Sequence, residues 1–174
     1  LIGVIAEAET PQATREMDRF LESMKKGGAK SGMTVFVNSH FGESFRVSKD
    51  PQVVALREKI MEHLLHLSPE QLENGRQIFH RQMISKNELQ KITVPVLILA
   101  GDEDQPSNIS AYKRLSQVIP HVNYKTLQHA GYYVAIEQPQ AVIQLLHEHI
   151  EKAESAFSSR ISAKGKEKEK RSRH

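Results

Sequence analysis

The residues best suited to chemistry stand in two polar segments, each of which follows an apolar stretch. The sequence G-D-E-D at 101–104 comes directly after Val94–Ala100, and H-A-G-Y at 129–132 comes shortly after Val122–Leu127. Open α/β sheets place ligands and catalytic groups just beyond the carboxyl ends of their strands. A carboxylate from the first segment and a proton-accepting side chain from the second would make an acid–base pair. An acidic turn that only meets solvent has the same local sequence, and the local residues alone favour that interpretation.

The serine nearest to a nucleophile pattern is Ser44, in the sequence G-E-S-F-R at 42–46. A nucleophilic serine on a strained strand-to-helix turn needs small neighbours, because the strand and the helix crowd it. Phe45 and Arg46 are bulky, so we interpret Ser44 as a loop serine. Ser39-His40 is a single adjacent pair in a polar stretch, and the sequence assigns it no role.

The spacing of the histidines and the lack of cysteine limit which metal and cofactor sites are possible. His63 and His66 lie three residues apart on a predicted helix, without a third ligand at a spacing typical of zinc. The chain has no cysteine, which excludes disulfides, thiolate metal sites and a cysteine nucleophile. Such a composition fits a reducing compartment, and we expect the cytoplasm. The sequence predicts no metal and no cofactor.

The composition is that of a globular domain with a charged tail. Hydrophobic residues make up 39% of the chain and charged residues 26%, which suits one domain of ordinary size. Residues 160–174 hold seven Lys/Arg and two Glu, a net charge of +5, so the rest carries 3 − 5 = −2. Interleaved glutamates and the lack of aromatics favour a solvated, disordered tail from residue 156 over nucleic-acid binding. No apolar run approaches the ~18 residues that a membrane span needs.

The pattern of apolar residues predicts alternating strands and helices, an order that implies parallel strands with right-handed crossovers. The unbroken apolar run Val94–Ala100 is typical of a parallel strand that is buried on both faces. Gly27-Gly28 marks a helix end, and residues 29–50 carry no clear pattern. The predicted elements are strands at 1–5, 94–100 and 122–127, and helices that open at Pro11, Pro51, Pro69, Ile109 and Pro139.

Two segments together resemble the C-terminal third of the α/β-hydrolase family. They are I-T-V-P-V-L-I-L-A-G-D-E-D at 92–104 and Q-H-A-G-Y-Y-V-A-I-E-Q-P at 128–139. In that family the first segment reads G-x-x-D after its strand, and this Asp orients the catalytic histidine. The resemblance therefore implies that Asp104 is the catalytic acid. The family's Gly-His dipeptide stands here as Gly131-Tyr132, so the base position carries a tyrosine.

Several residues together support the alignment at the base position. Gly131, Glu137 and Pro139 fall at the family's offsets from position 132, and a shifted alignment that uses His129 would lose all three. We therefore interpret Tyr132 as a true replacement. A phenol with a pKa of about 10 stays protonated at pH 7, whereas a general base needs a pKa closer to the ~6.5 of imidazole. His129 would be an alternative base only if a loop turned its side chain toward the position that residue 132 occupies. We expect His129 at the surface.

The resemblance implies an α/β fold, namely a partial α/β-hydrolase-like parallel sheet of three strands with a helical lid insertion. Residues 1–8 would supply the family's sixth strand, 9–91 the helical lid, 92–155 the C-terminal hydrolase core and 156–174 the disordered basic tail. The family's nucleophile elbow and oxyanion-hole loop precede this portion, so we expect the chain to lack both.

Two functions of different classes follow. The first is a hydrolase of small apolar ester-like substrates when complete, which is expected to be inactive as this chain. The alternative is a non-catalytic relative that acts as a binding or interaction module. Because the first strand would expose an unpaired edge, we also expect self-association or a partner that completes the sheet. A small-molecule substrate or ligand is the other expected partner, and neither a membrane nor a nucleic acid is expected.

Overall fold

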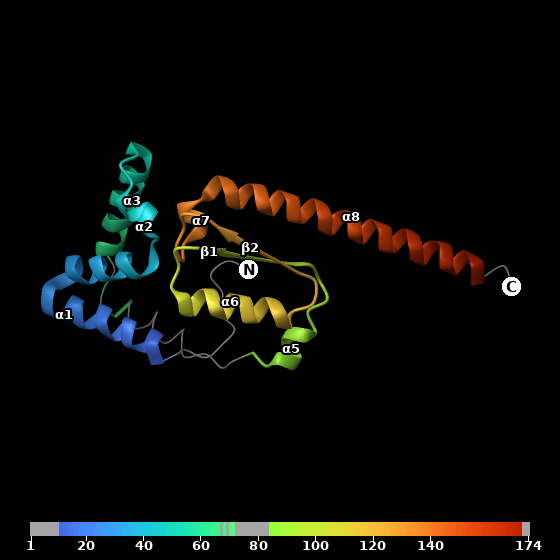
Figure 1. Cartoon of the computed structure of the whole chain (residues 1–174), viewed down its shortest axis with the longest axis horizontal. Helices are drawn as coiled ribbons and strands as arrows, with labels where there is room; N and C mark the ends of the chain where they lie inside the picture. Colours follow the sequence, from blue (N-terminus) through green and yellow to red (C-terminus); the bar gives the residue numbers. More distant parts are fainter. Residues whose placement is uncertain (1–10, 67, 69, 72–83, 172–174) are drawn as a thin grey trace. The chain divides into compact units, whose positions relative to one another are not determined.

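The computed structural model describes residues 11–66, 68, 70–71 and 84–171, and Figure 1 shows their course. The chain divides into two compact units, residues 1–138 and 139–174, which are described separately. In chain order the elements of the first unit are α1 (Pro11–His40), α2 (Glu43–Val47), α3 (Pro51–Leu65), α5 (Lys86–Gln90), β1 (Val96–Gly101), α6 (Pro106–Val118), β2 (Val122–Leu127) and α7 (Val134–Glu137). The second unit contains α8 (Pro139–Arg171).

The sheet of the described residues has two parallel strands, as the sequence predicts for 94–100 and 122–127. Val96 pairs with Val122 at one end of β1 and β2, and Gly101 pairs with Leu127 at the other. Because parallel strands end at the same edge, the segments that follow Gly101 and Leu127 start side by side. The third predicted strand, at residues 1–5, lies outside the described residues.

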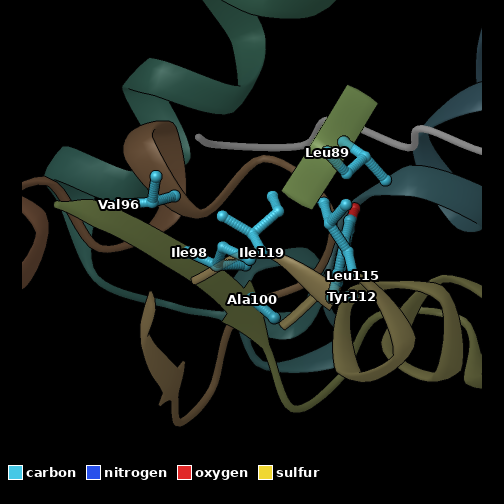
Figure 2. Close-up of a cluster of buried hydrophobic side chains, with 7 residues drawn as sticks. All are labelled: Leu89, Val96, Ile98, Ala100, Tyr112, Leu115 and Ile119. Carbon is cyan, nitrogen blue, oxygen red and sulfur yellow. The ribbon is translucent and has the colours of Figure 1, made fainter. Parts of the chain in front are cut away.

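The core of this unit lies between β1 and α6, which contacts both strands (Figure 1). Alternate residues of β1 face the same side of the sheet, and Figure 2 shows Val96, Ile98 and Ala100 gathered with residues from α5 and α6. The whole cluster is Leu89, Val96, Ile98, Ala100, Tyr112, Leu115 and Ile119. Leu97 and Leu99 on the opposite face are buried too, which confirms a strand buried on both faces. Full burial of each large aliphatic side chain contributes about 1.5–3 kcal/mol.

Helix α1 is two helices joined at Gly28, whose φ of 72° and ψ of −179° are not helical. The predicted helix end at Gly27-Gly28 is therefore a sharp break, after which the chain becomes helical again. The two halves pack against each other in antiparallel order: the rings of Phe20 and Phe36 lie 5.7 Å apart, and the hydroxyls of Ser23 and Ser31 lie 2.8 Å apart. Residues 29–40 show no clear helical pattern in the sequence. Their helix is therefore supported by tertiary packing more than by local propensity.

Helix α3 confirms the helix predicted to open at Pro51. Asp50 caps it, since its Oδ1 accepts hydrogen bonds from the N–H groups of Gln52 at 2.8 Å and Val53 at 3.3 Å. Most of the helix predicted from Pro69 lies outside the described residues. Helices α1 and α3 contact each other, and the role of residues 9–91 as a lid stays a prediction.

The second unit differs from its sequence-based expectation, because α8 continues through residues 156–171, where composition predicts a disordered tail. Alanine, lysine, glutamate and arginine, which dominate this stretch, all have high intrinsic helix propensity. Few residues of this stretch are apolar, so little in it can anchor the helix to a core. Among the described helices, none is long and apolar enough to cross a membrane.

Candidate functional site

Three backbone segments meet at the carboxyl ends of β1 and β2, and glycines allow their close approach. A Cβ on Gly101 would overlap the carbonyl oxygen of Ala130, and a Cβ on Gly131 would overlap the backbone nitrogen of Gly42. The acid segment 101–104 and the base segment 129–132 are also joined by the N–H of Glu103, which donates to Ala130 O at 2.9 Å. The third segment, residues 40–44, runs from the end of α1 into the first turn of α2, and the sequence did not predict it here.

Glu137 holds two of these segments together. Its Oε2 accepts hydrogen bonds from the N–H of Gly42 at 2.8 Å and from the N–H of Gly131 at 3.0 Å. Burial raises the pKa of Glu137, although the two N–H groups oppose that shift. The sequence singled out Glu137 only for its offset within the E-Q-P pattern, and its contacts supply a physical reason for a carboxylate at that place.

Asp104 is a buried carboxylate, with only 7% of its surface exposed. Its Oδ1 accepts hydrogen bonds from the N–H of Gln105 at 2.7 Å and from Nδ2 of Asn108 at 2.9 Å. Its buried Oδ2 lies near the Tyr112 hydroxyl, which lowers the pKa of Asp104, but within the described part of the chain neither atom has a hydrogen bond of normal geometry. Burial raises the pKa of Asp104, against the hydrogen bonds from Asn108 and Gln105. The buried position after β1 is the one that the sequence predicts for the catalytic acid.

Tyr132 lies within electrostatic reach of Asp104. Burial and then the negative charge of Asp104 raise the pKa of the Tyr132 phenol above its ordinary value near 10. The backbone N–H of Tyr132 donates to the carbonyl oxygen of His40 at 2.9 Å. Position 132 therefore lies beside the acid segment, and its side chain is a phenol that stays protonated at neutral pH.

His129 lies away from the hydrogen bonds of Asp104 and contacts Glu103 and Ser44. Its Nδ1 stands 3.6 Å from Oε1 of Glu103 and 3.3 Å from Oγ of Ser44. The side chain is 69% exposed, and the backbone has a left-handed φ of 60°. His129 is therefore a surface residue beside the second carboxylate of the acid segment.

Ser44 is not the loop serine that the sequence suggests, because it lies in the first turn of α2. Its N–H donates to Oε2 of Glu103 at 2.7 Å, and its hydroxyl donates to Oε1 of the same carboxylate. Burial raises the pKa of Glu103, but the hydrogen bonds from Ser44, and then His129, outweigh burial and bring it below the ordinary value.

Ser44, His129 and Glu103 have the residue types of a catalytic triad, but not its geometry. A triad histidine uses one ring nitrogen for the serine and the other for the carboxylate. Here the same nitrogen, Nδ1 of His129, faces both partners. The Ser44 hydroxyl donates a hydrogen bond to a carboxylate whose pKa is lowered, so this contact anchors α2 to the acid segment and does not activate a nucleophile.

His40 is the residue that sequence reasoning missed. Its ring stacks on Phe36, with centroids 4.4 Å apart, and meets the edge of Tyr132 at 5.8 Å. When protonated, His40 lowers the pKa of Asp104, which places the two within electrostatic reach. No local sequence pattern marks it, because the fold of α1 alone brings it to the acid segment.

No group of three or more His, Asp or Glu side chains able to hold a metal occurs among the described residues. His63 and His66, the pair noted in the sequence, are both exposed near the end of α3. The Nδ1 of His66 lies 2.7 Å from the carbonyl oxygen of Glu62 on the preceding helical turn. That contact uses one ring nitrogen within the chain's own backbone.

Solved structures provide the comparison that sequence does not. Neither protein-family models nor curated proteins contain a match to this sequence. A thermophilic esterase from Thermogutta terrifontis is 24% identical with a TM-score of 0.69, over 88% of this chain and 55% of that chain. MenH from S. aureus is 18% identical with a TM-score of 0.70, over 88% of this chain and 58% of its own. The enol-lactonase from Burkholderia xenovorans is 18% identical with a TM-score of 0.68, over 86% and 54%.

These similarities confirm the predicted resemblance at the level of fold. The chain has the α/β-hydrolase fold over the portion that it covers, with a parallel β1–β2 pair and helices packed on it. It spans little more than half the length of each of these relatives. The sequence-based prediction of a partial α/β fold holds to that extent.

Proposed function

We propose that this chain is the portion of an α/β-hydrolase-fold protein that holds the acid and base positions, and that the complete form acts on a small apolar ester-like substrate. We propose further that the chain by itself does not hydrolyse esters. The observation that carries the second part is the phenol of Tyr132, which lies within electrostatic reach of Asp104 and has a raised pKa. The esterase and enol-lactonase among the similar structures support the substrate class.

A phenol at the base position is chemically unsuited to activating a nucleophile. Even at its ordinary pKa of about 10, roughly one phenol in a thousand is ionised at pH 7, and burial and the charge of Asp104 lower that fraction further. A protonated phenol donates a hydrogen bond but cannot take the proton of a serine hydroxyl. The hydroxyl of Ser44, the serine nearest to a nucleophile pattern, donates a hydrogen bond to Glu103.

The second candidate is a non-catalytic member of the same fold that binds a ligand or a partner protein. The hydrogen bonds that Asp104 accepts from Gln105 and Asn108 favour it, because they engage one carboxylate oxygen in local contacts at the beginning of α6. The predicted division into a strand at 1–8, a lid at 9–91 and a core at 92–155 is common to both candidates. Self-association, or a partner that completes the sheet, is part of the proposal and would be measured by light scattering.

Ester hydrolysis tests the proposal directly. The purified chain is mixed with p-nitrophenyl butyrate, and its rate is compared with that of the same chain unfolded in urea, because surface imidazoles cause slow background release. We expect no saturable turnover above this background, and equal rates for the Ser44→Ala and His129→Ala variants. Saturable turnover that either substitution abolishes would overturn the proposal, since it would make the Ser44 contact a working nucleophile.

A further inference from the structure

Helix α2 has little within itself to keep it folded. It is five residues long, and isolated helices of that length are unstable in water because nucleating a helix costs more than so few hydrogen bonds contribute. Phe45 is its buried residue and stacks on Phe41, with ring centroids 5.0 Å apart. Burial of one aromatic side chain does not offset the entropy lost in fixing five residues. The stability of α2 therefore depends on contacts from other elements.

The first turn of α2 is capped by carboxylates from other segments. Its N-cap residue, Gly42, has no side chain that could accept the free N–H groups of a first helical turn. Oε2 of Glu103 accepts the N–H of Ser44 at 2.7 Å, and Oε1 accepts the Ser44 hydroxyl. Oε2 of Glu137 accepts the N–H of Gly42 itself at 2.8 Å. A Cβ on Gly42 would come too close to Oε2 of Glu103, so the glycine leaves room for this cap.

The last turn of α2 is capped by an arginine of α3. Nη1 of Arg57 donates to the carbonyl oxygens of Arg46 at 2.8 Å, Phe45 at 3.0 Å and Ser48 at 3.4 Å. The carbonyl groups at the C-terminal end of a helix have no partner inside the helix, so they need such a donor. An anion at the first turn and a cation at the last both interact favourably with the helix dipole. Glu103 from the acid segment and Arg57 from α3 therefore stabilise α2 from its two ends.

Glu103 is the cap whose charge can change. Among the described residues, the ionisable side chains that face it are His129, whose Nδ1 lies 3.6 Å from Oε1 of Glu103, and Glu137, whose pKa the charge of Glu103 helps to raise. Burial acts to raise the pKa of Glu103, but the hydrogen bonds from Ser44 bring it below the ordinary value. Glu103 is therefore charged at neutral pH and becomes neutral in acid, whereas the guanidinium of Arg57 keeps its proton throughout.

We propose that α2 is a conditional helix, which is ordered only while the Glu103 carboxylate caps its first turn and the Arg57 guanidinium caps its last. When Glu103 loses its charge, residues 43–47 unwind, while Glu137 still holds Gly42 beside Gly131. Helix α2 thus couples the charge of the acid segment to the attachment of α3. The coupling is reciprocal, so displacing α2 also returns Glu103 to the behaviour of an ordinary carboxyl group. This regulation goes beyond the proposed function and does not depend on ester hydrolysis.

Cα chemical shifts of the ¹³C- and ¹⁵N-labelled chain at pH 7 test the inference, because they report whether each residue is helical. Glu103→Gln replaces the carboxylate with one uncharged carbonyl oxygen and an amide, which weakens the cap. We expect the helical shifts of residues 44–46 to fall by about half or more, with those of α3 unchanged. Asp102→Asn is the matched control. It removes an exposed charge from the same turn without touching the cap, and it should leave α2 helical.

Arg57→Gln tests whether the two caps act on one cooperative helix. Glutamine cannot reach all three carbonyl oxygens that Nη1 of Arg57 contacts, so the last turn of α2 loses its cap. If α2 forms and unwinds as a unit, the helical shift of Ser44 at the far end should fall together with that of Arg46. Loss at Arg46 with Ser44 unchanged would contradict the conditional helix, because each cap would then support only its own turn.

The wild-type chain provides a test that needs no substitution. The folded-state pKa of Glu103 is lowered from 4.5, so the cap is complete above that value and is lost as the pH falls through the lower folded-state pKa. The helical shifts of α2 should disappear with the same midpoint as the carboxyl ¹³C titration of Glu103, and before those of α3. Three results would each overturn the inference: an α2 that stays helical in Glu103→Gln, an equal effect of Asp102→Asn, or an α2 that is lost in acid only together with α3.

Discussion

Glu103 and Asp104 are neighbours in the sequence, yet they occupy opposite environments. Asp104 is buried, accepts hydrogen bonds from Gln105 and Asn108, and has a raised pKa. The side chain of Glu103 keeps 23% of its surface exposed, accepts both donors of Ser44 and has a lowered pKa. For each carboxyl group, the direction of the pKa shift depends on whether desolvation or hydrogen bonding to the charged form is the larger effect.

The comparison teaches that residue type is a poor guide to the role of a carboxylate. Glu103 has a serine and a histidine beside it, which are the usual members of a hydrolytic triad, but its hydrogen bonds hold α2 in place. Asp104 has no serine beside it, and the groups from other segments that affect its pKa are tyrosine and His40 side chains. Substitutions in each region, and at the glycine contact on which both depend, separate the two roles.

The largest effect is expected from Gly131→Ala, because this glycine packs the base segment against residues 40–42. The overlapping atoms belong to the backbone, so they cannot swing aside as a side chain would. We expect a loss of about 3 kcal/mol in the free energy of unfolding, measured by urea denaturation. Gly28→Ala is the control: its φ of +72° is strained for alanine, but no atom lies within 4 Å, and about 1 kcal/mol is expected. Equal losses would contradict the packing argument.

Glu103→Gln should destabilise the chain at pH 7 by about 1–2 kcal/mol, because charge-assisted hydrogen bonds from Ser44 are weakened. The folded-state pKa of Glu103 is lowered from 4.5, so its stabilising contribution is complete above that value. The contribution is lost as the pH falls through the lower folded-state pKa. Thermal melts from pH 7 down to acid pH should therefore show the two proteins converging at the acid end. A constant difference at every pH would contradict this account.

Asp104→Asn should act in the opposite direction and stabilise the chain at pH 7 by about 1 kcal/mol, because the buried charge is removed while the Oδ1 acceptor remains. The folded-state pKa of Asp104 is raised from 3.8. Stability of the wild type therefore falls as the pH rises from that value to the folded-state pKa, and the variant escapes this loss. The same melts measure it, and the gain should vanish at acid pH. A variant less stable than wild type at pH 7 would show that the carboxylate's partners outweigh its burial.

The smallest effect is expected from His129→Ala, at less than about 0.5 kcal/mol, because a contact made by an exposed side chain contributes little. Ser44→Ala is the matched change on the other side of the same contact. It should cost about 1 kcal/mol, since it removes the hydroxyl that donates to Glu103. Urea denaturation of both variants separates them. If His129→Ala were the more harmful change, the imidazole and not the serine would be the anchor of Glu103.

Much of the fold could be predicted from local sequence. The apolar run at 94–100 and the segment at 122–127 are the two observed strands, and Asp50-Pro51 and Pro139 mark the starts of α3 and α8. These elements carry their signals within a few residues, as an unbroken apolar run or a capping residue. The short helices α2, α5 and α7 were missed because four or five residues hold too little periodicity to register.

The sequence by itself determined the parallel strand pair, the acid segment after β1 and the tyrosine at position 132, because each depends on residues adjacent in the chain. Only the tertiary structure decided which side chains meet there. The break at Gly28 folds α1 back on itself and brings His40 within electrostatic reach of Asp104, and Glu137 accepts hydrogen bonds from both Gly42 and Gly131. Contacts of this kind join residues that are distant in sequence, and close backbone packing selects them where no local pattern can.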